Sequence, residues 1–242
     1  MRRTLVEELE RETRRLTCWL RANAAARRIL DGTTDLAGYV QFLSQTYHYV
    51  RWTRPLLARA GEQLRRLGRY PALAELFAVK AREEAGHEQW ALADLRALGR
   101  DPAAIANEPP TAAVSAYLAW NRFTVESASP VAFLGTAYVL EGLSVHCGEE
   151  AVRNLCRNST IPGIAGAVSF VRGHAGADVD HMEQLRSLFS QVLGTRDRTA
   201  VLLSARVTRT LYQGLFAYPV DAYRRRNARW NRDSRSRAPT LS

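Results

Sequence analysis

Apolar residues recur along this chain at the spacing of an α-helix, and strand-like alternation of apolar and polar residues is nowhere sustained. Proline and glycine stand where such helices would begin or end, because proline suits the first turn of a helix and glycine suits the residue after the last turn. The pattern predicts an all-α fold with helices over residues 3–30, 36–67, 71–98, 110–127, 130–156, 161–191 and 197–230.

A single helical domain is expected, because no internal repeat, low-complexity linker or shift in composition interrupts the helices. With 242 residues, 46% of them hydrophobic, the chain can bury a sizeable core. The domain is predicted to span residues 1–230, and residues 231–242 are predicted to form a basic, disordered tail.

The cysteines and the apolar segments bear on the compartment. Three cysteines are too few and too widely spaced for a disulfide framework or a zinc ribbon, which favours a reducing environment. The N-terminal segment lacks the apolar stretch and cleavage site of a signal peptide, and no apolar run approaches the roughly 20 residues that span a bilayer. We therefore expect a cytoplasmic protein that does not contact a membrane.

The formal net charge of +10 is concentrated in the C-terminal segment "YRRRNARWNRDSRSRAPTLS", while the rest of the chain mixes the two signs as solvated helix faces do. Such a tail is either a solvated extension or an arm that binds nucleic acid. No nucleic-acid recognition motif accompanies it, so nucleic acid is not the expected partner.

The octet "HAGADVDH" brings two histidines and two aspartates into eight positions of a chain with five histidines. On a helix, His174, Asp178 and His181 lie within about 60° of one another, and Asp180 lies on roughly the opposite side. Two imidazoles and a carboxylate on one face are suitable ligands for a divalent transition metal. The alternative is a solvated polar stripe.

A second segment, "VKAREEAGHEQW", places Lys80, Glu84 and His87 at the same offsets of 0, 4 and 7 on a predicted helix. Glu83 competes with Glu84 for the role of ligand, and the more central position of Glu84 on the stripe favours Glu84. A lone helical histidine is more often structural than metal-binding, but two matched stripes favour a shared metal site.

A third segment, "AFLGTAYVLEGLSVHCGEE", has Glu141 in the middle of an apolar helix face. A buried carboxylate is costly unless it is paired or bound to a cation. Glu141 is therefore either a metal ligand or a capped or arginine-paired glutamate. His146 lies about 140° further around the helix and is not expected to take part.

Together, "EEAGH", "LEG" and "HAGADVDH" resemble the haem-oxygenase-like di-iron oxidases and oxygenases, a family of iron-containing redox enzymes. The resemblance implies a seven-helix haem-oxygenase-like bundle and a non-haem centre of two Fe(II) ions per chain that uses O2 as co-substrate. It implies the metal ligands Glu84, His87, Glu141, His174, Asp178 and His181. "TYHYVRWTRPLL" is also similar, so Tyr47, His48 and Tyr49 are expected to line the pocket.

The expected reaction is the oxidation of a small amine, amino acid or carboxylate in specialised metabolism, by N-oxygenation, desaturation or oxidative carbon–carbon cleavage. The expected partners are a small-molecule substrate, an external electron donor and a second copy of the chain in a homodimer. Three alternatives stay open. They are a metal-independent, thiaminase-like or cofactorless enzyme of the same fold, a ferritin-like di-iron bundle, and a non-catalytic protein whose basic tail binds nucleic acid.

Lys80 is the only lysine among 34 basic residues. It lies seven residues before His87, where several members of the family that the chain resembles have a carboxylate or histidine ligand. Lys80 is either a surface residue equivalent to arginine or a buried amine with a chemical role. Because lysine, unlike arginine, can lose its proton on burial and act as a base or nucleophile, we predict that Lys80 is catalytic.

Overall fold

The computed structural model describes residues 3–189 and 193–216, and within these residues all regular structure is helical. The all-α prediction is confirmed, and the predicted tail over 231–242 lies outside the described residues. The α-helices are α1 (Leu5–Ala22), α2 (Ala24–Leu30), α3 (Leu36–Val50), α4 (Thr53–Arg66), α5 (Pro71–Glu83), α6 (His87–Ala97), α7 (Pro102–Asn107), α8 (Ala112–Phe123), α9 (Phe133–Asn158), α10 (Ser169–Phe189) and α11 (Thr195–Gln213).

Three of the predicted long helices are each divided into two. The first is divided at Asn23, whose side-chain Oδ1 accepts hydrogen bonds from the N–H groups of Ala25 and Ala26 and so begins α2. The second is divided at Arg51 and Trp52, and the third between Glu83 and His87. Both halves of each pair bury apolar residues, so the apolar spacing alone did not reveal the breaks.

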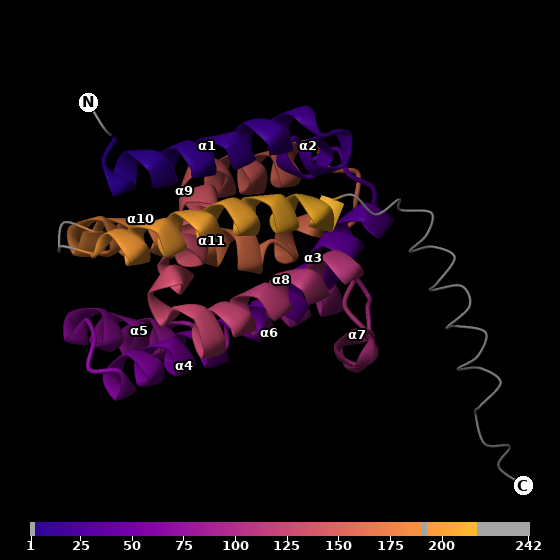
Figure 1. Ribbon diagram of the computed structural model, residues 1–242. Helices are drawn as coiled ribbons and strands as arrows, with labels where there is room; N and C mark the ends of the chain where they lie inside the picture. Colours follow the sequence, from indigo (N-terminus) through magenta and orange to yellow (C-terminus); the bar gives the residue numbers. More distant parts are fainter. Residues whose placement is uncertain (1–2, 190–192, 217–242) are drawn as a thin grey trace, which may run out of the picture.

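The helix α9 lies at the centre of the bundle and packs against α1, α10 and α11 (Figure 1). In the same view α1 and α2 lie on one side of α10 and α11, and α4, α5, α6 and α8 lie on the other. Residues Pro130–Asn158 are long and apolar enough to span a membrane, but 61% of their most apolar window is buried in the bundle, as in a core helix.

The helix α10 begins at Ser169, eight residues later than predicted, because a side chain from α6 caps it there. The carboxylate of Asp94 accepts hydrogen bonds from the N–H groups of Ser169 and Phe170, both at 2.9 Å, and from the Ser169 hydroxyl. A carboxylate at this position satisfies N–H groups that have no partner within the helix. The cap fixes α10 against α6, the two helices that carry His174 and His87.

Glu10 joins α1 to α9 and α10. Its Oε1 accepts hydrogen bonds from the Tyr138 hydroxyl and from Arg186, both at 2.6 Å, and its Oε2 lies 3.8 Å from the ring of His146. Burial raises the pKa of Glu10, but the hydrogen bonds from Arg186 and Tyr138 outweigh it and hold the pKa below the ordinary 4.5.

Glu10→Gln keeps an acceptor oxygen but removes its charge, so it should lower the free energy of unfolding at neutral pH by about 1–2 kcal/mol, roughly the difference between hydrogen bonds to a charged and to a neutral acceptor. Because the folded-state pKa is lowered, the contribution of Glu10 is complete above 4.5 and is lost as the pH falls through the folded-state value. Denaturant unfolding of both proteins across the acid range measures this. The gap between them should narrow on acidification, and a constant gap would contradict the assignment.

Candidate metal centre

Glu84 and His87 are brought together by a break between two helices. The helix α5 ends at Glu83, Gly86 adopts the left-handed region with φ of +90°, and α6 begins at His87. The expectation that Lys80, Glu84 and His87 share one continuous helix is therefore wrong. The turn nevertheless leaves the Glu84 carboxylate 3.1 Å from Nδ1 of His87.

His174 of α10 completes a cluster with these two residues. One ligand atom from each of Glu84, His87 and His174, which we call the triad, lies within 4.8 Å of the other two. Ligands at about 2.1 Å from an ion are separated by up to about 4.2 Å, so a small inward movement would close the triad around one ion. The side chains of Glu84 and His87 are only 10% and 11% exposed.

Neighbouring groups orient both imidazoles. Nδ1 of His174 lies 3.0 Å from the carbonyl oxygen of Phe170, to which it can only donate, so Nε2 carries the lone pair available to a metal. The ring of His87 stacks on Trp90 at a centroid distance of 4.0 Å. Trp90 in turn packs on Gly173, where an added Cβ would lie 2.5 Å from the indole.

The donor set of the triad is two imidazoles and one carboxylate. This combination, with coordination positions left open, is the one that non-haem Fe(II) oxygenases use. Glu84 and His174 both line a cavity, so an ion held by the triad would lie beside that cavity. The residues present therefore fit an Fe(II) ion.

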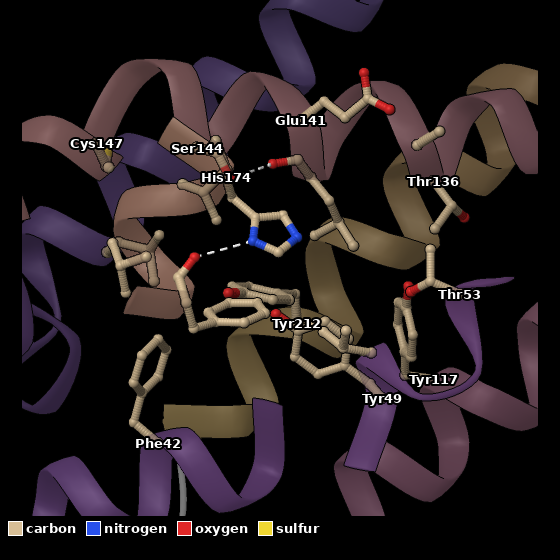
Figure 2. Close-up of a pocket in the computed structure, with 18 of the residues that line it drawn as sticks. Phe42, Tyr49, Thr53, Tyr117, Thr136, Glu141, Ser144, Cys147, His174 and Tyr212 are labelled. Carbon is tan, nitrogen blue, oxygen red and sulfur yellow. Dashed lines mark hydrogen bonds between the residues drawn. The ribbon is translucent and has the colours of Figure 1, made fainter. Parts of the chain in front are cut away.

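The other predicted ligands stand differently. Glu141 of α9 lines the same cavity and its side chain is 15% exposed, but Figure 2 shows its carboxylate turned away from the His174 imidazole. The side chains of Asp178 and His181 lie outside the described residues, although the backbone of α10 carries both. Their predicted roles as metal ligands stay predictions.

Lys80 is buried, with an exposure of 3%, so it is not a surface substitute for arginine. Its Nζ lies 3.6 Å from Oε2 of Glu83 and 3.9 Å from Oε1 of Glu141. These contacts place Nζ of Lys80 between two carboxylates. The contacts also distinguish the two neighbouring glutamates, because Glu83 pairs with Lys80 and Glu84 belongs to the triad.

The cavity beside the triad is lined mainly by apolar and aromatic side chains. Of the three residues expected there from the sequence, Tyr49 lines it, whereas Tyr47 and His48 are buried outside its lining. Sequence reasoning missed Tyr117 and Tyr212, which line the cavity from α8 and α11 (Figure 2). It also missed Phe170, although its place four residues before His174 is a signal that helical spacing offers.

The turn at Gly86 allows a test of how the triad is built. Gly86→Ala would force a side chain into the left-handed region although nothing lies within 4 Å of the added Cβ, so it should destabilise the protein by about 1–2 kcal/mol and weaken iron binding. Gly176→Ala is the control, because this glycine is helical with equally open space, and alanine there should stabilise by about 0.5–1 kcal/mol. Thermal unfolding and iron titration of both variants measure the difference, and equal behaviour would contradict it.

Several solved structures resemble this chain. A domain of unknown function with a haem-oxygenase-like fold from Shewanella denitrificans is 20% identical, with a TM-score of 0.78 over 97% of this chain and 98% of that chain. A TenA homologue from P. horikoshii is 15% identical, with a TM-score of 0.69 over 89% and 99% of the two chains. A TenA homologue from Pseudomonas syringae pv. tomato is 14% identical, with a TM-score of 0.66 over 88% and 93%.

At these identities the solved structures establish the fold alone, and the fold is haem-oxygenase-like. No curated protein matches the sequence. The model of a family described as iron-containing redox enzymes matches residues 40–213, which include the whole triad. The chain therefore belongs to the family of iron-containing redox enzymes.

Proposed function

We propose that this protein is a non-haem iron oxidase or oxygenase that uses O2 to oxidise a small amine, amino acid or carboxylate. The observation that carries the proposal is the triad, two histidines and one carboxylate grouped within 4.8 Å at the wall of a cavity. A bound Fe(II) ion would supply the electron transfer to O2 that side chains of this kind cannot supply.

The residues around the triad prepare the site for that chemistry. Phe170 and Trp90 hold the imidazoles of His174 and His87 in place, so little reorganisation is needed when the ion binds. Tyr117, Tyr212 and their apolar neighbours give the cavity a mainly apolar lining, which would disfavour water beside activated oxygen and limit its side reactions. If one oxygen atom enters the substrate and the other becomes water, an external donor must supply the remaining electron pair.

A second Fe(II) ion per chain is part of the proposal. Glu141 would bind it from α9, and Asp178 and His181 from α10, one and two turns beyond His174. Nζ of Lys80 lies 3.9 Å from Oε1 of Glu141, so Lys80 would position this carboxylate beside the second ion. We propose that Lys80 acts beside the reacting centre.

The metal-independent alternative needs a nucleophile in the cavity. Cys147 lines the cavity and Cys156 is exposed. Burial raises the pKa of the Cys147 thiol, which keeps it protonated and a poor nucleophile at neutral pH. The surroundings of Cys147 therefore favour the iron-dependent function.

Anaerobic titration of the metal-free protein with Fe(II), followed by exposure to O2 in an oxygen electrode, tests the proposal. We expect about two ions to bind per chain, with the triad filling first because its donors already converge. Oxygen uptake should then require both the bound iron and an added amine or carboxylate substrate. Failure to bind Fe(II), or oxygen uptake that is the same without protein-bound iron, would contradict the proposed function.

A further inference from the structure

We propose that Trp90 is a one-electron relay between the triad and the protein surface. After the iron centre has reacted with O2, the indole of Trp90 would give the centre one electron and would recover an electron from an external one-electron reductant. The proposal rests on the proposed function, which requires such a reductant, but it concerns the route of the electrons and not the substrate.

The indole of Trp90 lies against both histidines of the triad. Its ring is 4.0 Å from the ring of His87, centroid to centroid, and the two planes differ by 23°. The ring of His174 lies 5.6 Å from the indole and meets it edge-on, at 81°. Electron transfer between rings becomes slower as their separation grows, so an indole stacked directly on a metal ligand is well placed to supply an electron.

The other aromatic neighbour of the triad is not an electron donor. Among the described residues, the side chains that make ring contacts with the two imidazoles, apart from the imidazoles themselves, are Trp90 and Phe170. A phenyl ring is much harder to oxidise than an indole, so Phe170 can position His174 but cannot supply an electron. The indole is therefore the oxidisable ring in contact with these ligands.

Trp90 also connects the triad with the surface. His87 is buried and Phe170 is only 7% exposed, whereas Trp90 is half-buried. Beside Trp90 lies the exposed Ser169, whose Oγ is 3.4 Å from the Trp90 carbonyl oxygen. A soluble reductant can therefore approach Trp90, although it cannot approach the imidazole of His87 directly.

Gly173 of α10 leaves room for the indole in this position. A Cβ added at Gly173 would lie 2.5, 2.9 and 3.1 Å from three carbon atoms of the Trp90 indole. Carbon atoms that are not bonded pack at about 3.5–4.0 Å, so the indole would have to shift to admit a side chain there. The place of the indole beside His87 thus depends on a glycine in the facing helix.

The electron balance requires a donor besides the substrate. Reduction of O2 to two water molecules takes four electrons and four protons, and a substrate oxidised by two electrons supplies half of them. The external reductant supplies the other two electrons, one at a time, through Trp90. Each passage oxidises the indole to a radical and then restores it, and the indole proton is released to water and taken up again.

Without a reductant the relay should damage itself. The indole radical would lose a second electron to the iron centre and add a water molecule. In total the indole then gains one oxygen atom and releases two electrons and two protons. This product is a permanent mark of the electron route.

Freeze-quenched electron paramagnetic resonance tests the relay. The full-length protein is loaded anaerobically with Fe(II), mixed with O2 in the absence of substrate, and frozen at a series of times. We expect an organic radical whose signal narrows in protein that contains ring-deuterated tryptophan. The signal should be lost in Trp90→Phe, although iron loading should be kept because phenylalanine retains an aromatic ring beside His87.

Trp120→Phe is the matched control and should keep the radical. Trp120 is also half-buried, but it lies on α8, where its Nε1 is 3.4 Å from the Ser204 hydroxyl oxygen. Among the described residues its ring contact is with Phe123 and not with the triad.

Peptide mass spectrometry of the same reactions gives a second readout. Trp90 should gain one oxygen atom and Trp120 should not, and ascorbate, added as the one-electron reductant, should suppress the gain. Gly173→Ala should lower the oxidation of Trp90, because the indole is still present but displaced. Gly176→Ala should match the wild type, because nothing lies within 4 Å of a Cβ added there.

The outcomes separate the relay from the proposed function. Iron binding and O2 uptake without a tryptophan radical, or with the same radical in Trp90→Phe, would overturn the relay and leave the proposed function standing. Equal oxidation of Trp90 and Trp120, or oxidation of Cys147 in place of Trp90, would also overturn the relay. Absence of iron binding or of O2 uptake would contradict the proposed function, and the relay with it.

Discussion

His174→Ala is expected to remove iron from the triad and to leave the helical fold intact. The substitution removes Nε2 of His174, the nitrogen left free to bind a metal when Nδ1 donates to the Phe170 carbonyl oxygen. Only Glu84 and His87 would remain from the triad. Loss of an outer partner of a ligand already costs ten- to a hundredfold in metal affinity, so loss of the ligand itself should cost more than about a hundredfold. Because His174 is only half-buried, we expect the substitution to have a small effect on folding.

Iron content after anaerobic loading and desalting tests this prediction. Far-ultraviolet circular dichroism of the same samples tests whether the helical fold is kept. His146→Ala is the matched control, because His146 is 40% exposed, lies beside Glu10 and does not belong to the triad. The control should keep the iron content of the wild type. Equal iron in the His174 and His146 variants would show that the triad is not the binding site.

Lys80→Arg is expected to reduce turnover by more than about tenfold although the formal charge is kept. Lys80 is buried, and its compact ammonium lies between the carboxylates of Glu83 and Glu141. The larger, planar guanidinium cannot occupy the same space without displacing Glu141, and overpacking of this kind typically costs about 1–3 kcal/mol. The expected defect is therefore in the placement of Glu141 as well as in folding.

Iron stoichiometry and turnover should be measured together for this variant. Loss of the second ion with retention of the first would follow from a displaced Glu141, and Arg82→Lys on the exposed side of α5 should change neither quantity. A Lys80→Arg protein with full turnover and full iron loading would mean that the ammonium of Lys80 has no part in the site.

The fold was predictable because helical spacing and the punctuation by proline and glycine are local properties of the sequence. The breaks that divide the long helices were harder to predict from the sequence. Gly86 is an example, since a glycine inside an apolar pattern is also tolerated within a continuous helix. The start of α10 could not be predicted, because it depends on Asp94, a cap that is 75 residues away from Ser169 along the chain.

The site was predicted in part. The sequence placed Glu84 beside His87 by helical rotation, and the structure places them side by side through a left-handed turn, while their role as metal ligands stays a prediction. The contact between His87 and His174, at a ring distance of 4.9 Å, follows from the packing of α6 on α10. Local spacing contains no information about such packing.

The most direct test of the central claim is an anomalous-difference map at the iron edge, from crystals of the full-length protein loaded anaerobically with Fe(II). The account predicts a peak within bonding distance, about 2 Å, of a Glu84 carboxylate oxygen and of one ring nitrogen each of His87 and His174. A map with iron bound elsewhere in the protein, and none between these three side chains, would contradict it.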